Sequence, residues 1–140
     1  KLAKSNIPYL LGRILAIYDA IEQYALNIQK EDRPTNAMRL YAPFQEHPFV
    51  TLTTLDKKIR PYVEKLGRKC DYLLSMKQDL MEELYTEMDI EAVEHIQNLN
   101  AYFVIGFDCQ RNEIKRINTE RKEKNKQKEE SKLWQHSQTK

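Results

Sequence analysis

The feature that most constrains this sequence is an apolar periodicity of helical type near its start. The apolar side chains that repeat at intervals of three and four are Ile7, Leu10, Leu11, Ile14, Ile17, Tyr18, Ile21, Ala25 and Ile28. This spacing predicts one long amphipathic helix. Asn6 is placed to cap it, and Pro8 is tolerated in its first turn. Pro34 disfavours helix at Arg33, so we expect the helix to end near Glu31.

Four further segments with helical spacing follow at short intervals. They cover residues 35–47, 49–66, 70–85 and from 89 onward. Pro43 and Pro61 are expected to bend the second and third helices of the chain, and Gly67 to end the third. Only 3 of the 140 residues are glycine, which argues against the many tight turns of a β-sandwich. We therefore predict an all-α antiparallel bundle of about five helices over residues 1–117.

The apolar pattern stops at the end of the predicted bundle. Thr119 to Ser131 contains no apolar side chain, so residues 118–140 have nothing to bury. We expect a charged, flexible C-terminal tail, either a solvated extension of the last helix or a disordered segment. Trp134 is either a docking anchor within this tail or part of a frayed end.

Motifs of catalysis are not found. The sequence has no glycine-flanked serine, no glycine-rich loop before a lysine and no His-Glu-x-x-His. Glu91 and His95 would supply only part of a metal site, and Cys70 and Cys109 are expected in the core. We therefore expect a protein without enzyme activity, metal or cofactor. No apolar run is long enough to cross a membrane, and the start lacks the apolar stretch of a signal peptide, so we expect a cytoplasmic protein.

Charge is sorted along the chain. The segment from Asp56 to Lys69 has six bases and two acids. On a helical wheel five of these bases span about 120° beside the apolar stripe, an arrangement that can follow a phosphate backbone. The bases of this strip are Lys57, Lys58, Lys65, Arg68 and Lys69. The alternative is an ordinary solvated helix face, and Gly67 would interrupt the strip if it ends the helix.

An acidic segment follows the basic one. From Asp79 to Glu94 there are seven acids and no base. This segment would repel DNA, so it faces either solvent or a basic protein. The second possibility defines an alternative function, a helical adaptor or inhibitor that docks through its acidic helix and does not bind nucleic acid.

Two stretches of the sequence are distinctive: Pro8-Tyr9-Leu10-Leu11-Gly12-Arg13-Ile14-Leu15-Ala16 and Phe103-Val104-Ile105-Gly106-Phe107-Asp108-Cys109-Gln110-Arg111. Both resemble the C-terminal helical domain in the large subunit of type I-C CRISPR interference complexes. Shorter motifs keep a similar order between them: Asp32-Arg33, Asn36-Ala37-Met38, Phe44-Gln45-x-His47-Pro48 and Pro61-Tyr62-x-x-Lys65-Leu66. The resemblance covers residues 8–117. Asp108-Cys109 replaces an aromatic–His pair, so no role is carried over to those positions.

In that family the same region is also made as a separate small subunit by internal translation. The resemblance therefore implies a non-catalytic subunit that lines the belly of an RNA-guided surveillance (Cascade) complex in more than one copy. Its implied partners are the large subunit, the backbone subunits, and the target and displaced DNA strands, with guide RNA as a further candidate.

Four residues that match the family carry expectations of their own. A glycine inside an apolar helix suggests a close helix contact, so we expect packing roles for Gly12 and Gly106. Arg13 and Arg111 are either buried pairing groups or phosphate contacts.

Overall fold

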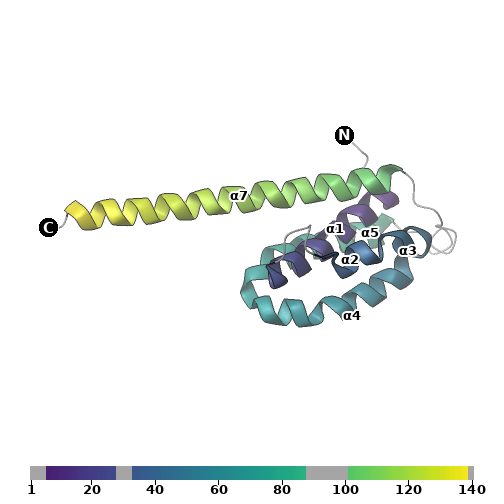
Figure 1. Ribbon diagram of the computed structural model, residues 1–140. Coiled ribbons are helices and arrows are strands. Elements are labelled where there is room, and N and C mark those ends of the chain that lie inside the picture. The colour runs from purple at the N-terminus through teal and green to yellow at the C-terminus, as the bar shows by residue number, and fades with distance from the viewer. Residues whose placement is uncertain (1–5, 28–32, 88–100, 139–140) are drawn as a thin grey trace.

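The computed structural model describes residues 6–27, 33–87 and 101–138, and nearly all of these residues are helical (Figure 1). The elements are α1 (Ile7–Leu26), α2 (Asn36–Arg39), α3 (Tyr41–Glu46), α4 (Pro48–Leu66), the 3-10 helix η1 (Gly67–Cys70), α5 (Asp71–Glu87) and α7 (Ala101–Gln138). The predicted all-α bundle is confirmed. The start expected for the last helix near residue 89 lies outside the described residues.

Helix α1 is the centre of the bundle. Its residues Leu11, Ile14, Leu15, Ile17 and Ile21 have no exposed surface. Helices α4, α5 and α7 pack around it, so its apolar side chains are covered on more than one side. Because burial of each such side chain contributes about 1.5–3 kcal/mol, α1 supplies a large share of the core.

The helices do not all alternate in direction. Figure 1 shows α5 running in the direction opposite to α4, as expected for consecutive helices of an antiparallel bundle. Helix α7 instead runs in the same direction as α1, because Tyr9 lies against Gly106 while Arg13 contacts Gln110 and Glu113. The first and last helices of the bundle therefore form a parallel pair.

The sequence predicted the start of α1 correctly and its end incorrectly. The predicted cap is confirmed, since Asn6 Oδ1 accepts a hydrogen bond of 3.0 Å from the Tyr9 amide. The predicted end near Glu31 is wrong, because α1 ends at Leu26. Asn27 there adopts a left-handed conformation with φ 49°, which asparagine tolerates better than most residues.

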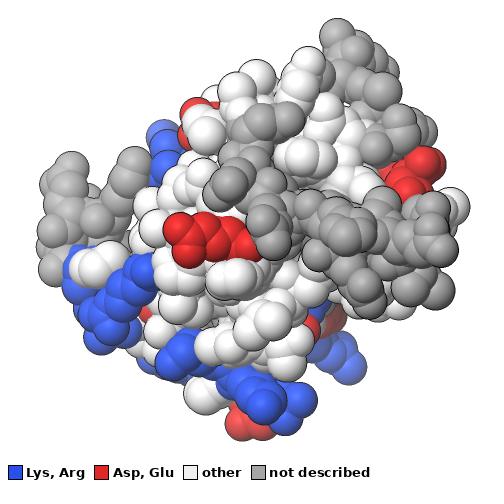
Figure 2. Space-filling view, turned by 90° about the vertical axis from the view of Figure 1, so that its right-hand side faces the viewer, with Lys and Arg blue, Asp and Glu red and all other residues white. Residues whose placement is uncertain are grey.

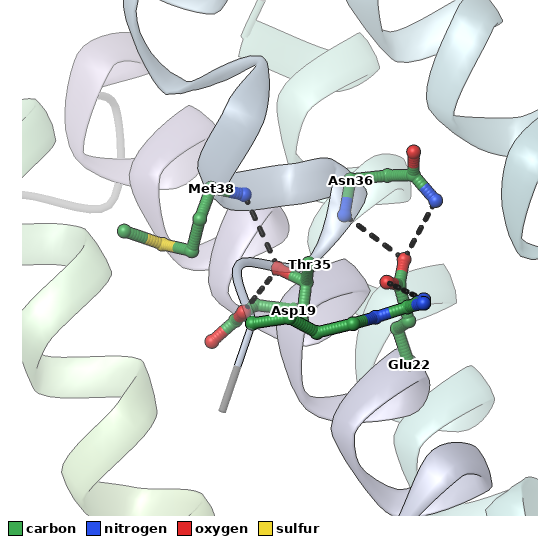
Figure 3. A network of polar contacts seen from close by, with 6 residues as sticks. Asp19, Glu22, Thr35, Asn36 and Met38 are labelled. Atoms are coloured by element: carbon green, nitrogen blue, oxygen red, sulfur yellow. Dashed lines mark hydrogen bonds and ion pairs between the residues drawn. The ribbon is translucent and has the colours of Figure 1, made fainter. Parts of the chain in front are cut away.

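The second predicted helix is divided into α2 and α3 at Leu40, although we expected a bend at Pro43. Pro43 lies in the first turn of α3, where the backbone amide has no partner within the helix, so it does not break that helix. The start of α2 is tied to α1 by buried polar groups (Figure 3). Glu22 Oε1 accepts hydrogen bonds from the Asn36 amide at 3.0 Å and from its side chain at 2.8 Å.

The tail continues α7 as a helix through Gln138, one of the two alternatives left by the sequence. Residues 119–135 are all exposed. The C-terminal part of α7 consequently projects beyond the bundle (Figure 1).

Candidate nucleic-acid interface

The predicted basic strip begins on the outer surface of α4. Lys57, Lys58 and Lys65 lie on this helix with exposed side chains. The apolar face of α4 anchors them, because Leu52, Leu55 and Ile59 are buried in the core. In Figure 2, Lys and Arg side chains gather along the lower edge of the molecule, the side on which α4 lies in Figure 1. None of the three lysines has an ion-pair partner among the described residues.

The strip is not a single helix face, and our five-base helical wheel was wrong in this respect. Helix α4 ends at Leu66, and Gly67 has φ 57°, a conformation that favours glycine. Arg68 and Lys69 therefore lie on η1, the turn that follows, where both are exposed. The first three bases of the strip therefore lie on α4, whereas Arg68 and Lys69 lie on the turn where the chain leaves the direction of α4.

Two further charged residues are exposed on α4 and were not part of the predicted basic strip. Arg60 and Glu64 are exposed on α4, on the side away from its buried stripe. The same helical wheel would have found Arg60. Glu64 reduces the positive charge of this face, so the bases of α4 do not form an uninterrupted cationic surface.

Arg13 joins two helices in this structure. Its Nε donates a 2.8 Å hydrogen bond to Gln110 Oε1, and its Nη2 lies 3.8 Å from Glu113 Oε2. Its guanidinium also lies 5.6 Å from the centre of the Tyr9 ring. Of the two roles that the sequence left open, the geometry favours pairing between α1 and α7 over contact with phosphate.

Gly12 and Gly106 lie where α1 and α7 touch. A Cβ atom added at Gly12 would overlap the carbonyl oxygen of Phe103 and lie 2.9 Å from the Phe107 nitrogen. One added at Gly106 would overlap the carbonyl oxygen of Tyr9. The two main chains consequently approach more closely than side-chain packing would allow.

A groove between α1 and α7 was missed by the sequence analysis. It has a volume of about 770 Å³, and its basic lining residues are Arg111, Lys115, Arg121, Lys122, Lys124 and Lys128. The Arg111 guanidinium lies 5.4 Å from the centre of the Phe107 ring at one end. These bases were assigned to the end of the bundle and to a tail, and only the course of α7 over α1 brings them together.

Metal ligands and cysteines are the remaining candidates for chemistry among the described residues. No group of three or more potential metal ligands occurs among them, and Glu91 and His95 lie outside this part of the chain. Burial raises the pKa of the Cys70 thiol, and the nearby carboxylate of Asp71 adds to the shift, so the reactive thiolate is disfavoured. Cys109 is exposed, contrary to the core position predicted for it, because α7 buries Phe103, Phe107 and Gln110 on another face.

The acidic segment is described only in part. Asp79, Glu82 and Glu87 are exposed on α5, whereas Asp89, Glu91 and Glu94 lie outside the described residues. Among the described helices, none has a long enough apolar stretch to cross a membrane.

Comparison with known proteins gives one match. A family model described as CRISPR-associated protein (Cas_Csd1) matches residues 2–115, which include α1 to α5 and the first part of α7. Neither the curated proteins nor the solved structures include a significant match. Since the family model covers most of the 140 residues, the chain belongs to the Cas_Csd1 family of CRISPR-associated proteins.

Proposed function

We propose that this chain is a non-catalytic small subunit of a type I-C RNA-guided surveillance complex, where it lines the belly and contacts backbone subunits. Its role there is to stabilise the target and displaced DNA strands through basic helix faces. The family supports a place among CRISPR proteins. The observation that carries the DNA role is the exposed set of bases on α4 and η1, Lys57, Lys58, Lys65, Arg68 and Lys69.

These bases suit contact with phosphates and not with base edges. Lysine ammonium groups on an exposed helix bind phosphate as point charges and carry little sequence information. Sequence recognition would remain with pairing between the guide RNA and its target. We therefore expect the subunit to strengthen DNA binding about equally for all sequences.

The test is a salt titration of target-DNA binding by the assembled complex. Replacement of Lys57, Lys58 and Lys65 by alanine should weaken binding and reduce the slope of log K against log salt by about 0.9 for each lost duplex contact. A control with the same loss of charge replaces Arg39, Lys126 and Lys132, which are exposed on α2 and α7. Equal affinities and slopes for wild type and the Lys57, Lys58 and Lys65 variant would contradict the DNA role of α4.

The alternative is an adaptor that docks through α5. It is supported by the exposed carboxylates Asp79, Glu82 and Glu87. Charge reversal at these positions should prevent assembly with a basic protein partner. Assembly that is insensitive to this change would contradict the adaptor function.

A further inference from the structure

The groove between α1 and α7 differs from the strip on α4 in shape and in place. It is a concave site of about 770 Å³ bounded by the second half of α1 and the middle of α7. Helix α1 separates α7 from α4 in the bundle (Figure 1). A ligand in this groove would therefore occupy a different side of the protein from one bound along α4.

The lining of the groove is strongly cationic. Six bases line it, and Asp19 is the one carboxylate among the lining residues of the described chain. Asp19 is 2% exposed and accepts hydrogen bonds from Gln23 and from Thr35, the second of which is drawn in Figure 3. Its charge is therefore already held by protein donors. Glu113 and Glu120, which are also on α7, form their ion pairs with Arg13 and Arg116 outside the groove.

Several of the bases are available for a ligand. Lys115, Lys122, Lys124 and Lys128 are exposed, and their ammonium groups have no ion-pair partner among the described residues. Arg121 is oriented by Tyr72, with its guanidinium 4.1 Å from the ring centre. Side-chain amides of Gln23, Asn118 and Asn125 also line the groove and add hydrogen-bonding groups. This combination suits a chain of phosphates and sugars.

An aromatic ring in the groove distinguishes a single-stranded from a double-stranded nucleic acid as its ligand. Tyr24 lines the groove from α1, and 46% of its surface is exposed. Bases of a single strand can stack on such a ring, whereas a duplex keeps its base faces stacked on one another. We propose that the groove between α1 and α7 binds a single-stranded nucleic acid, with the α7 lysines on its phosphates and Tyr24 stacked on a base. The proposal draws on the proposed nucleic-acid role of the protein but does not depend on the α4 strip.

The full chain is tested by fluorescence anisotropy with a labelled oligothymidylate of about 15 nucleotides and a duplex of equal length, at low salt. Tyr24→Ala should weaken single-strand binding about 5- to 150-fold, the range for loss of one stacked base, and leave duplex binding unchanged. Tyr24→Phe keeps the ring and should retain affinity. Equal single-strand affinity of Tyr24→Ala and wild type would overturn the proposal.

A second pair of variants distinguishes binding by the groove lysines from attraction by positive charge anywhere on α7. Replacing Lys122 and Lys128 by alanine should reduce the salt slope for the single strand by about 1.4. Replacing Lys126 and Lys132, which are exposed on α7 but do not line the groove, removes the same charge and should have a much smaller effect. Equal losses in the two variants would overturn the groove as a site. Lys57→Ala with Lys58→Ala separates the two proposals. If it alone abolished single-strand binding, the α4 proposal would stand and the groove proposal would fail.

Discussion

Gly12 and Gly106 occupy reciprocal positions, each lying against the main chain of the helix that carries the other. The carbonyl oxygen of Phe103 fills the space that a side chain at Gly12 would need, and that of Tyr9 fills the space at Gly106. This contact joins the two ends of the described bundle, because α1 is its first helix and α7 its last. Its loss should therefore affect the whole fold.

Gly106→Ala should destabilise the protein by about 1–3 kcal/mol, because the new Cβ atom would overlap the Tyr9 carbonyl group. In an open helix the same change would stabilise by up to about 1 kcal/mol, so the sign of the effect reports the close contact. Urea denaturation measures it, with Asn112→Ala at an exposed position of α7 as the control. A stability equal to or above that of wild type would show that α1 and α7 do not touch there.

Glu22→Ala should destabilise the protein by about 1.5–3 kcal/mol, because two donors of Asn36 would lose a buried charged acceptor. Glu22→Gln should cost less, since its carbonyl oxygen can still accept both hydrogen bonds. Thermal or urea denaturation of wild type, Glu22→Gln and Glu22→Ala should give decreasing stability in that order. Glu46→Ala, at the exposed end of α3, is a matched control expected to stay within about 0.5 kcal/mol of wild type.

Tyr18 should make stability fall in alkaline solution. Burial, followed by the hydrogen bond to Asp56 and its negative charge, raises the pKa of Tyr18 above 10.0. Because the folded state keeps this proton more tightly than the unfolded state, the contribution to stability is complete below about pH 10 and is lost as the pH rises further.

Tyr18→Phe isolates this contribution. The variant should be less stable than wild type at about pH 8, where it lacks the hydrogen bond to Asp56, and the difference should narrow by about pH 11. Urea midpoints of both proteins across this range measure the effect. A difference that stays constant with pH would contradict a raised pKa for Tyr18.

Removal of the projecting part of α7 should leave the bundle intact. Residues 123–135 are exposed, and the contacts of Asn118 and Arg121 with Tyr72 lie before this part. A chain that ends at Lys122 should therefore unfold at nearly the same temperature as the full chain and lose helical circular dichroism in proportion to the residues removed. A large fall in the unfolding temperature would mean that the projection stabilises the core.

Local signals in the sequence predicted most of the helices and some of their ends. Asn6 and Gly67 were identified correctly because a helix cap and a glycine with positive φ depend on nearby residues alone. The end of α1 was misplaced because Asn27 was not considered as a left-handed terminator. The break at Leu40 was missed because neither glycine nor proline stands at that position to mark it.

The candidate sites were harder to predict than the helices. The lysines of α4 could be found because they lie beside a clear apolar stripe on one helix. The α1–α7 groove could not be found in this way, since the tail has no apolar stripe to show which side faces α1. Lys122 and Lys128 share the groove with Tyr24 only because α7 continues past the crossing at Gly106.

Because α7 is one uninterrupted helix, its orientation on the bundle determines the position of its far end. Its 38 residues correspond to a length of about 57 Å, and Trp134 lies about 42 Å along the helix from Gly106. A tilt of about 10° about Gly106 would displace Trp134 by roughly 7 Å, and the contacts of Asn118 and Arg121 with Tyr72 oppose such a tilt. The close contacts of Gly12 and Gly106 with neighbouring carbonyl groups, together with the contacts at Tyr72, thus determine the position of the distant Trp134.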